Sequence, residues 1–142
     1  TRYGQEYDPE NEIIVTTGAS EAVDLAFRAF VDAGDVGAIP QPSYISYTPG
    51  AIFAGGEPLP VPTHAEDEFK LTPKALEAAG ADEADVLVRG YPNNPASAVM
   101  TDAELADVAD FVREHDLLVL SDEIYADLRY EDDQASIATH PG

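Results

Sequence analysis

The sequence contains no cysteine in its 142 residues, so disulfide bonds and thiolate metal sites are excluded. No stretch approaches the roughly 20 consecutive apolar residues of a membrane-spanning helix, and the first residues lack the basic-then-apolar pattern of a signal peptide. The three histidines (His64, His115 and His140) are scattered without the spacing of metal ligands, which predicts surface positions. We therefore expect no association with a membrane and no metal site.

Basic residues are scarce in this chain. Seven Lys and Arg residues stand against 28 Asp and Glu residues, which gives a formal charge of −21. Such a surface repels nucleic acid and anionic membranes, so we expect no nucleic-acid partner. The acidic residues are spread along the chain rather than gathered in one tail. This composition is typical of a halophilic, cytoplasmic protein, which we take as the expected setting.

The chain also lacks an initial methionine, since it begins with Thr1-Arg2-Tyr3-Gly4. A length of 142 residues is enough for one domain with a hydrophobic core but small for two. We therefore expect a fragment, a single partial domain over residues 1–142.

Apolar strand patterns alternate with helical patterns along the whole chain. The predicted strands cover residues 13–16, 36–39, 58–62, 86–88 and 117–120. The predicted helices follow Ser20, cover 43–54, lie between Thr72 and Gly80, and begin at Thr101. This order predicts an α/β fold with a mainly parallel sheet. The three prolines of 58–62 make that segment an edge strand, because each proline lacks a ladder donor.

Local signals mark where the helices begin and end. Gly34 is expected to end the first helix, and Pro49 should break or kink the second. Thr101 and Glu104 form a capping box for the last helix. An apolar stripe on the first helix is predicted to face the sheet: Val23, Ala26, Phe27, Phe30 and Val31.

The strand predicted over 117–120 consists of four apolar residues, a pattern typical of a strand buried on both faces. Asp122 and Tyr125 follow at its carboxyl end, where ligands bind in open α/β sheets. Asp122 would lie deep between strands, where a carboxylate needs a cationic partner that a protonated ring nitrogen would supply. The alternative is that Asp122 only caps the turn. Residues 131–142 then form an acidic tail that we expect to be mobile.

Three further polar clusters fall at predicted strand ends or helix starts. Gly18-Ala19-Ser20 opens a helix whose free N–H groups and positive dipole end would suit a phosphate. Tyr44 has the shape to stack on a planar ring, and Asn94 has an amide that would donate to a ring oxygen. Each cluster also has a plain structural explanation, as an ordinary helix start, a packed aromatic and a turn residue.

Five motifs occur in a characteristic order along the chain. They are Thr17-Gly18-Ala19-Ser20-Glu21-Ala22, Gly34-Asp35, Pro42-Ser43-Tyr44-Ile45-Ser46-Tyr47, Pro92-Asn93-Asn94-Pro95 and Ser121-Asp122-Glu123-Ile124-Tyr125. Together they resemble the class I/II aminotransferases, fold type I enzymes that use pyridoxal 5'-phosphate (PLP). The resemblance implies a three-layer α/β/α large domain, incomplete in this chain. It also implies amino-group transfer between an amino acid and a 2-oxo acid, by a homodimer.

The resemblance assigns roles to the first two clusters. Gly18, Ala19 and Ser20 correspond to the turn that binds the cofactor phosphate. Tyr44 corresponds to the aromatic residue that stacks on the pyridine ring.

It also assigns roles to the last two clusters. Asn94 is similar to the donor to the ring hydroxyl oxygen, and it lies near the substrate carboxylate in this family. Asp122 is similar to the aspartate that pairs with the ring nitrogen and keeps it protonated. Tyr125 is similar to the tyrosine that hydrogen-bonds the ring hydroxyl oxygen.

Two departures from the family pattern stand out. Ala96-Ser97 replaces the usual Thr-Gly, which puts a side chain in a turn that is expected to need φ > 0. The lysine that forms the Schiff base and the arginine that binds the substrate carboxylate come later in the family and are absent here. Lys70 and Lys74 do not fit that role, so we expect no catalytic residue and no transamination from this chain alone. Two later strands are absent too, so residues 13–16 should lack neighbours and leave a sheet edge exposed.

Other functions share these motifs. A PLP-dependent carbon–sulfur β-lyase has the same fold, although relatives of that kind often carry His at the position of Tyr125. A non-enzymatic, aminotransferase-like sensor domain of a transcription regulator is a second alternative, and a decayed, inactive reading frame is a third. The identity of the amino acid is outside the reach of this sequence.

Overall fold

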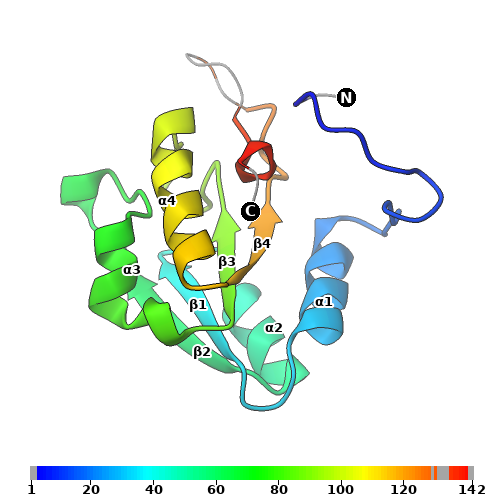
Figure 1. Cartoon of the computed structure of the whole chain (residues 1–142), viewed down its shortest axis with the longest axis horizontal. Helices are drawn as coiled ribbons and strands as arrows, with labels where there is room; N and C mark the ends of the chain where they lie inside the picture. Colours follow the sequence, from blue (N-terminus) through cyan, green and yellow to red (C-terminus); the bar gives the residue numbers. More distant parts are fainter. Residues whose placement is uncertain (1–2, 129, 131–134, 141–142) are drawn as a thin grey trace.

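Four parallel strands form one sheet in the computed structural model, which describes residues 3–128, 130 and 135–140 (Figure 1). They are β1 (Val36–Gln41), β2 (Glu57–Pro62), β3 (Val86–Gly90) and β4 (Leu118–Asp122), in the spatial order β2-β1-β3-β4. All three pairings are parallel. The predicted α/β fold with a parallel sheet is confirmed, and the proline-rich β2 is an edge strand, as expected.

Four helices cover the two faces of this sheet: α1 (Ala19–Phe30), α2 (Tyr47–Ala54), α3 (Pro73–Ala79) and α4 (Asp102–Glu114). Helices α3 and α4 pack on one face through Leu76 and Leu105, and α1 and α2 pack on the other through Phe27 and Ala51 (Figure 1). Two hydrophobic clusters therefore lie on opposite sides of the sheet, which makes three layers. Three short 3₁₀ turns lie at Ala65–Asp67, Ala81–Glu83 and Ile137–Thr139.

The helix ends follow most of the sequence signals. Thr101 and Glu104 form the predicted capping box, and Gly80 ends α3 with φ of 78°. The prediction for Pro49 was wrong: α2 begins at Tyr47 instead of residue 43. Pro49 therefore lies in the first turn, where no intrahelical bond needs its missing N–H. The first helix ends at Phe30, ahead of the predicted Gly34.

The apolar stripe of α1 is only partly buried. Val23, Phe27 and Val31 are buried as predicted, but Phe30 is exposed. Phe30 faces an open groove of about 490 Å³ between α1 and the outer side of β4, with Leu118 opposite it. The described strands provide no neighbour for β4 on that side.

The strand predicted over residues 13–16 does not form. These residues pair with no described strand, and Val15 is 94% exposed. This agrees with the expectation that the segment lacks neighbours, because a strand requires a hydrogen-bonding partner.

Strand β4 differs from its predicted burial for the same reason. It lies at the edge of the described sheet instead of its centre, and Leu118 is 44% exposed. The prediction of burial on both faces was therefore wrong for this chain.

The predicted mobile tail is partly a folded turn. Residues 131–134 and 141–142 lie outside the described residues, but 135–140 pack against the body of the protein. Ile137 and Ser136 are both buried, and Ile137 joins the cluster beneath α4. An apolar side chain that reaches the core outweighs the acidic character of the surrounding sequence.

Candidate active site

One cavity of about 240 Å³ lies at the carboxyl ends of the strands, beside the start of α1. Its lining residues are Ala19, Ser20, Val23, Tyr44, Tyr47, Gly90, Pro92, Asn94, Asp122, Ile124 and Tyr125. Six of the seven predicted cofactor-binding residues are among them, and the seventh, Gly18, directly precedes α1. The fold thus brings together four polar clusters, of which the first and the last are more than 100 residues apart in the sequence. Their convergence follows from the parallel sheet, which places the ends of all strands at one edge.

The start of α1 is arranged to receive an anion. Gly18 has φ of 84°, a backbone conformation that side chains other than glycine rarely adopt. Among the described residues no side chain caps this helix, and its first N–H groups have no intrahelical hydrogen-bond partner. Ser20 adds a hydroxyl at the cavity wall. Free N–H groups and the positive end of the helix dipole favour a phosphate or carboxylate at this place.

Asp122 lies on the opposite side of the same cavity, at the end of β4. Its Oδ2 accepts a 2.8 Å hydrogen bond from the Tyr47 phenol, and its Oδ1 accepts one of 3.0 Å from the Ile124 N–H. The carboxylate is partly exposed, so the prediction that it lies deep between strands was wrong for this chain. Among the described residues no ion pair to Asp122 is found. A negatively charged group faces the cavity with its outer lone pairs available to a cationic ligand.

Tyr47 is the buried partner of this carboxylate. Only 2% of the residue is exposed. Burial, followed by the hydrogen bond to Asp122, raises the pKa of its phenol well above the usual value. The hydroxyl therefore stays protonated and serves as a hydrogen-bond donor. Gly90 makes room for it: a Cβ at that position would lie 2.4 Å from the Tyr47 Oη.

The remaining side chains pair with one another across the cavity wall. Asn94 Nδ2 donates to Tyr125 Oη over 3.3 Å, which joins the turn after β3 to the turn after β4. The Ser20 and Tyr44 hydroxyls lie 3.4 Å apart, and hydrogen bonds with Ser20 and Ser46 lower the pKa of the Tyr44 phenol. The amide and three hydroxyls form a polar rim around the space in front of Asp122.

The turn that carries Asn94 confirms the expected backbone strain. Ser97 has φ of 59°, the left-handed conformation that the usual glycine would adopt without strain. The buried Asn93 holds this turn: its Oδ1 accepts a 3.0 Å bond from the Ala96 N–H, and its Nδ2 donates to Pro42 O. Asn93 is thus a structural residue, whereas Asn94 faces the cavity.

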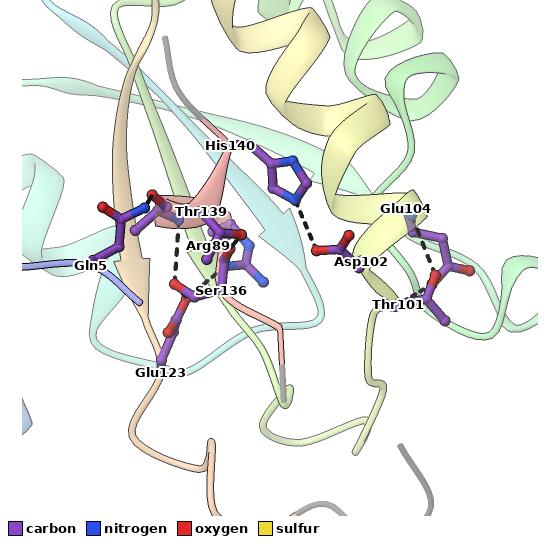
Figure 2. Close-up of polar contacts among 10 residues, drawn as sticks. Gln5, Arg89, Thr101, Asp102, Glu104, Glu123, Ser136, Thr139 and His140 are labelled. Atoms are coloured by element: carbon purple, nitrogen blue, oxygen red, sulfur yellow. Dashed lines mark hydrogen bonds and ion pairs between the residues drawn. The ribbon is translucent and has the colours of Figure 1, made fainter. Parts of the chain in front are cut away.

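Two residues were missed by reasoning from the sequence. Tyr47 belongs to a recognised motif, but its contact with Asp122 is visible only in the folded chain. Arg89 is buried at the end of the apolar strand β3, and its guanidinium donates to Ser121. It also pairs with Glu123 (Figure 2). A lone charge in an otherwise apolar strand was the available signal.

The other candidate residues lie away from this cavity. Lys70 pairs with Glu68 and Glu104 at 2.9 Å, and Lys74 is exposed on α3. His140 is less exposed than predicted, because its ring lies 3.1 Å from an Asp102 oxygen (Figure 2). Over residues 3–128, 130 and 135–140, no group of three potential ligands forms a metal site. Within the same residues, no helix is long and apolar enough to cross a membrane.

Known proteins resemble this chain over nearly its whole length. A family model described as aminotransferase class I and II matches residues 1–141. The putative aminotransferase YugH of Bacillus subtilis (strain 168) is 42% identical over 141 residues, which cover 99% of this chain and 36% of the relative. Aromatic-amino-acid aminotransferase 2 of Thermococcus litoralis is 38% identical over 128 residues, or 90% of this chain and 33% of the relative.

Solved structures agree with the sequence relatives. The crystal structure of an aromatic aminotransferase from Pyrococcus horikoshii OT3 matches with a TM-score of 0.94 at 42% identity, over 99% of this chain and 38% of that one. The chain spans about a third of the length of the curated relatives it matches.

Proposed function

The chain belongs to the class I and II aminotransferase family, and from that premise we propose that the complete protein is a PLP-dependent aminotransferase. This chain forms the central part of its large domain, and the lysine that holds the cofactor lies beyond Gly142. The reaction moves an amino group from an amino acid to a 2-oxo acid. A homodimer in the cytoplasm is the setting we propose with it.

The carboxylate of Asp122 is the observation that carries this proposal. It faces the cavity, is held by the Tyr47 phenol and the Ile124 N–H, and has no ion pair among residues 3–128, 130 and 135–140. Such a group suits a protonated ring nitrogen. The N–H groups at the start of α1, which no side chain of the described residues caps, suit a phosphate on the same ligand. PLP carries both groups: a ring nitrogen that is cationic when protonated, for the Asp122 side of the cavity, and an anionic phosphate, for the start of α1.

Each cavity residue then has a definite task. Asp122 would keep the proton on the ring nitrogen, and the hydrogen bond from Tyr47 would fix the orientation of that carboxylate. Gly18 and Ser20 would hold the phosphate, with Ala19 supplying a helix N–H. These contacts would bind and orient the cofactor at both ends.

The rim residues complete the arrangement. The ring of Tyr44 would cover one face of the cofactor, while Asn94 and Tyr125 would donate to its hydroxyl oxygen. Asn94 also lies where a substrate carboxylate would approach. With its nitrogen protonated, the bound ring acts as an electron sink for the bonds around the substrate α-carbon.

The proposal is for a reaction class rather than a single substrate. The relatives carry names that range from aromatic amino acids to aspartate and LL-diaminopimelate. The chain alone supplies neither the lysine nor a substrate-binding arginine, so it should bind PLP weakly and transfer no amino group.

Titration of the complete protein with PLP tests the proposal. We expect a new absorbance band from the bound cofactor. We also expect Asp122→Ala to weaken binding by roughly two orders of magnitude, because the charge pair with the ring nitrogen is lost. Asp107→Ala, on the exposed face of α4, is the matched control and should bind as the wild type does. Absence of the band, together with an unchanged Asp122→Ala variant, would refute the cofactor assignment.

A panel of amino acids with 2-oxo acids separates the proposed activity from its alternatives. An aminotransferase yields a new amino acid and a new 2-oxo acid, whereas a carbon–sulfur β-lyase releases a thiol, ammonia and pyruvate from a cysteine conjugate. PLP binding without either product would instead favour a sensor.

A further inference from the structure

Arg89 is a buried cation on the face of the sheet opposite the cavity. Its side chain is 2% exposed, and its guanidinium lies 5.3 Å from the centre of the Tyr91 ring, in the cluster beneath α4. Its neighbour Gly90 faces Tyr47 and the cavity. Successive residues of a strand point to opposite faces of the sheet. Arg89 therefore faces the α4 side, whereas Gly90 faces the cavity side.

The guanidinium belongs to a compact set of polar groups that includes Glu123 and Ser136 (Figure 2). Arg89 Nη1 donates to Ser121 Oγ over 2.7 Å and lies 3.4 Å from Glu123 Oε1. The hydroxyls of Ser121 and Ser136 donate to that same Glu123 oxygen, each over 2.9 Å. One carboxylate oxygen of Glu123 thus contacts the guanidinium and two hydroxyls. One of these hydroxyls, that of Ser136, belongs to the folded C-terminal turn.

The two residues that Arg89 contacts are the immediate neighbours of Asp122 in the chain. Ser121 and Glu123 face the guanidinium, so Asp122 between them must face the cavity. We propose that Arg89 is a positioning residue: through Ser121 and Glu123 it fixes the turn that presents Asp122 and Tyr125. The cofactor-related part of this inference rests on the proposed function.

Stability alone gives no reason for this arrangement. Burial opposes the charged form of Arg89 and lowers its pKa, while the Glu123 charge raises it again. The Arg89 Nε has no hydrogen-bond partner in the described structure, which adds to the cost of burial. Well-packed apolar side chains are often as stable as a buried ion pair. The Arg89–Glu123 pair instead links β3 to the turn after β4 through contacts of defined geometry.

The described contacts of the turn with the rest of the sheet lie on its two faces. Arg89 and Ser136 contact it on one face, and Tyr47 and Asn94 contact it on the other. The Tyr91 N–H also donates to the Asp122 carbonyl over 3.2 Å. Loss of Arg89 removes the link between β3 and the turn on the first face, and should therefore loosen the turn.

Two measurements on the complete protein test this role in the variants Arg89→Leu and Arg89→Lys. The first is amide hydrogen exchange at residues 121–125 without cofactor, where we expect Arg89→Leu to exchange about tenfold faster. The second is the pH midpoint of the absorbance of bound PLP, where we expect a shift of roughly half a pH unit or more. Arg89→Lys keeps the charge without the planar fork and should fall between Arg89→Leu and the wild type.

Two further variants separate positioning from general destabilisation. Leu76→Ala opens a cavity in the core at a fully buried site on α3, a helix that packs mainly against β2, and should change neither readout. The double variant Arg89→Leu/Glu123→Gln removes the stranded carboxylate, so it should fold even where Arg89→Leu does not. It should still show fast exchange at 121–125.

The outcomes are distinct. Unchanged exchange and an unchanged pH midpoint in Arg89→Leu would overturn the role of Arg89, as would equal changes in Leu76→Ala. If the wild-type protein bound no PLP, the proposed function would fail. The exchange measurement, made without cofactor, would still decide whether Arg89 holds the turn.

Discussion

The Tyr47 phenol donates a 2.8 Å hydrogen bond to the Asp122 carboxylate, across 75 positions of the sequence. The bond joins the first residue of α2 to the last residue of β4. It makes the orientation of the candidate cofactor-binding carboxylate depend on a helix from the opposite end of the sheet.

Replacement of Tyr47 by Phe should weaken PLP binding by the complete protein about tenfold or more. A hydrogen bond to a charged group contributes about 1.5–3 kcal/mol, and its loss leaves the carboxylate free to rotate. The dissociation constant, measured by absorbance titration, checks this. Tyr7→Phe, at an exposed site, should bind PLP as the wild type does. Equal affinities for Tyr47→Phe and wild type would show that the contact has no role in binding.

Gly90→Ala should destabilise the protein by about 1–3 kcal/mol through overpacking. The added Cβ would lie 2.4 Å from Tyr47 Oη, whereas at Gly37, on β1, the nearest atom is 3.9 Å away. Urea unfolding of Gly90→Ala and of its control Gly37→Ala checks the difference. The double variant Gly90→Ala/Tyr47→Phe should recover part of the loss, because the clashing hydroxyl is gone. Strict additivity of the two changes would contradict this explanation.

Ser97→Gly should stabilise the protein by about 0.5–1 kcal/mol. Ser97 is held at φ of 59°, and the cost of that conformation for a residue with a Cβ exceeds the extra chain entropy of glycine. Ser97→Ala keeps the Cβ and should show no gain. The free energy of unfolding in urea measures both, and a destabilised Ser97→Gly would mean that the serine side chain supports the turn.

Stability should fall at high pH because of Tyr91. Burial raises the pKa of its phenol from 10.0 to about 12. The folded-state pKa lies above the unfolded one, so this contribution is complete below pH 10 and is lost between about pH 10 and pH 12. The loss amounts to about 3 kcal/mol.

Tyr91→Phe should reduce the slope of stability against pH over that interval by about 1.4 kcal/mol per unit. A residual slope should remain, since the pKa of the buried Tyr47 is raised as well. The exposed Tyr130→Phe variant should parallel the wild type. Urea unfolding at a series of pH values measures the slopes, and identical slopes for Tyr91→Phe and wild type would contradict the prediction.

The sequence by itself determined the features that depend on neighbours in the chain. The capping box of Thr101 and Glu104 needs residues only three apart, and the apolar runs before Gly90 and Asp122 mark the positions of strands. The parallel sheet follows from the alternation of these elements. With it, the convergence of Ser20, Tyr44, Asn94 and Asp122 was predictable, because parallel strands end at one edge.

Only the tertiary structure decided which residues of distant segments touch. The Tyr47–Asp122 bond, the Arg89–Glu123 pair and the packing of Ile137 join segments with no common local pattern. Local propensity is a property of a few consecutive residues, whereas a pairing partner or a buried contact exists only once the whole sheet has assembled.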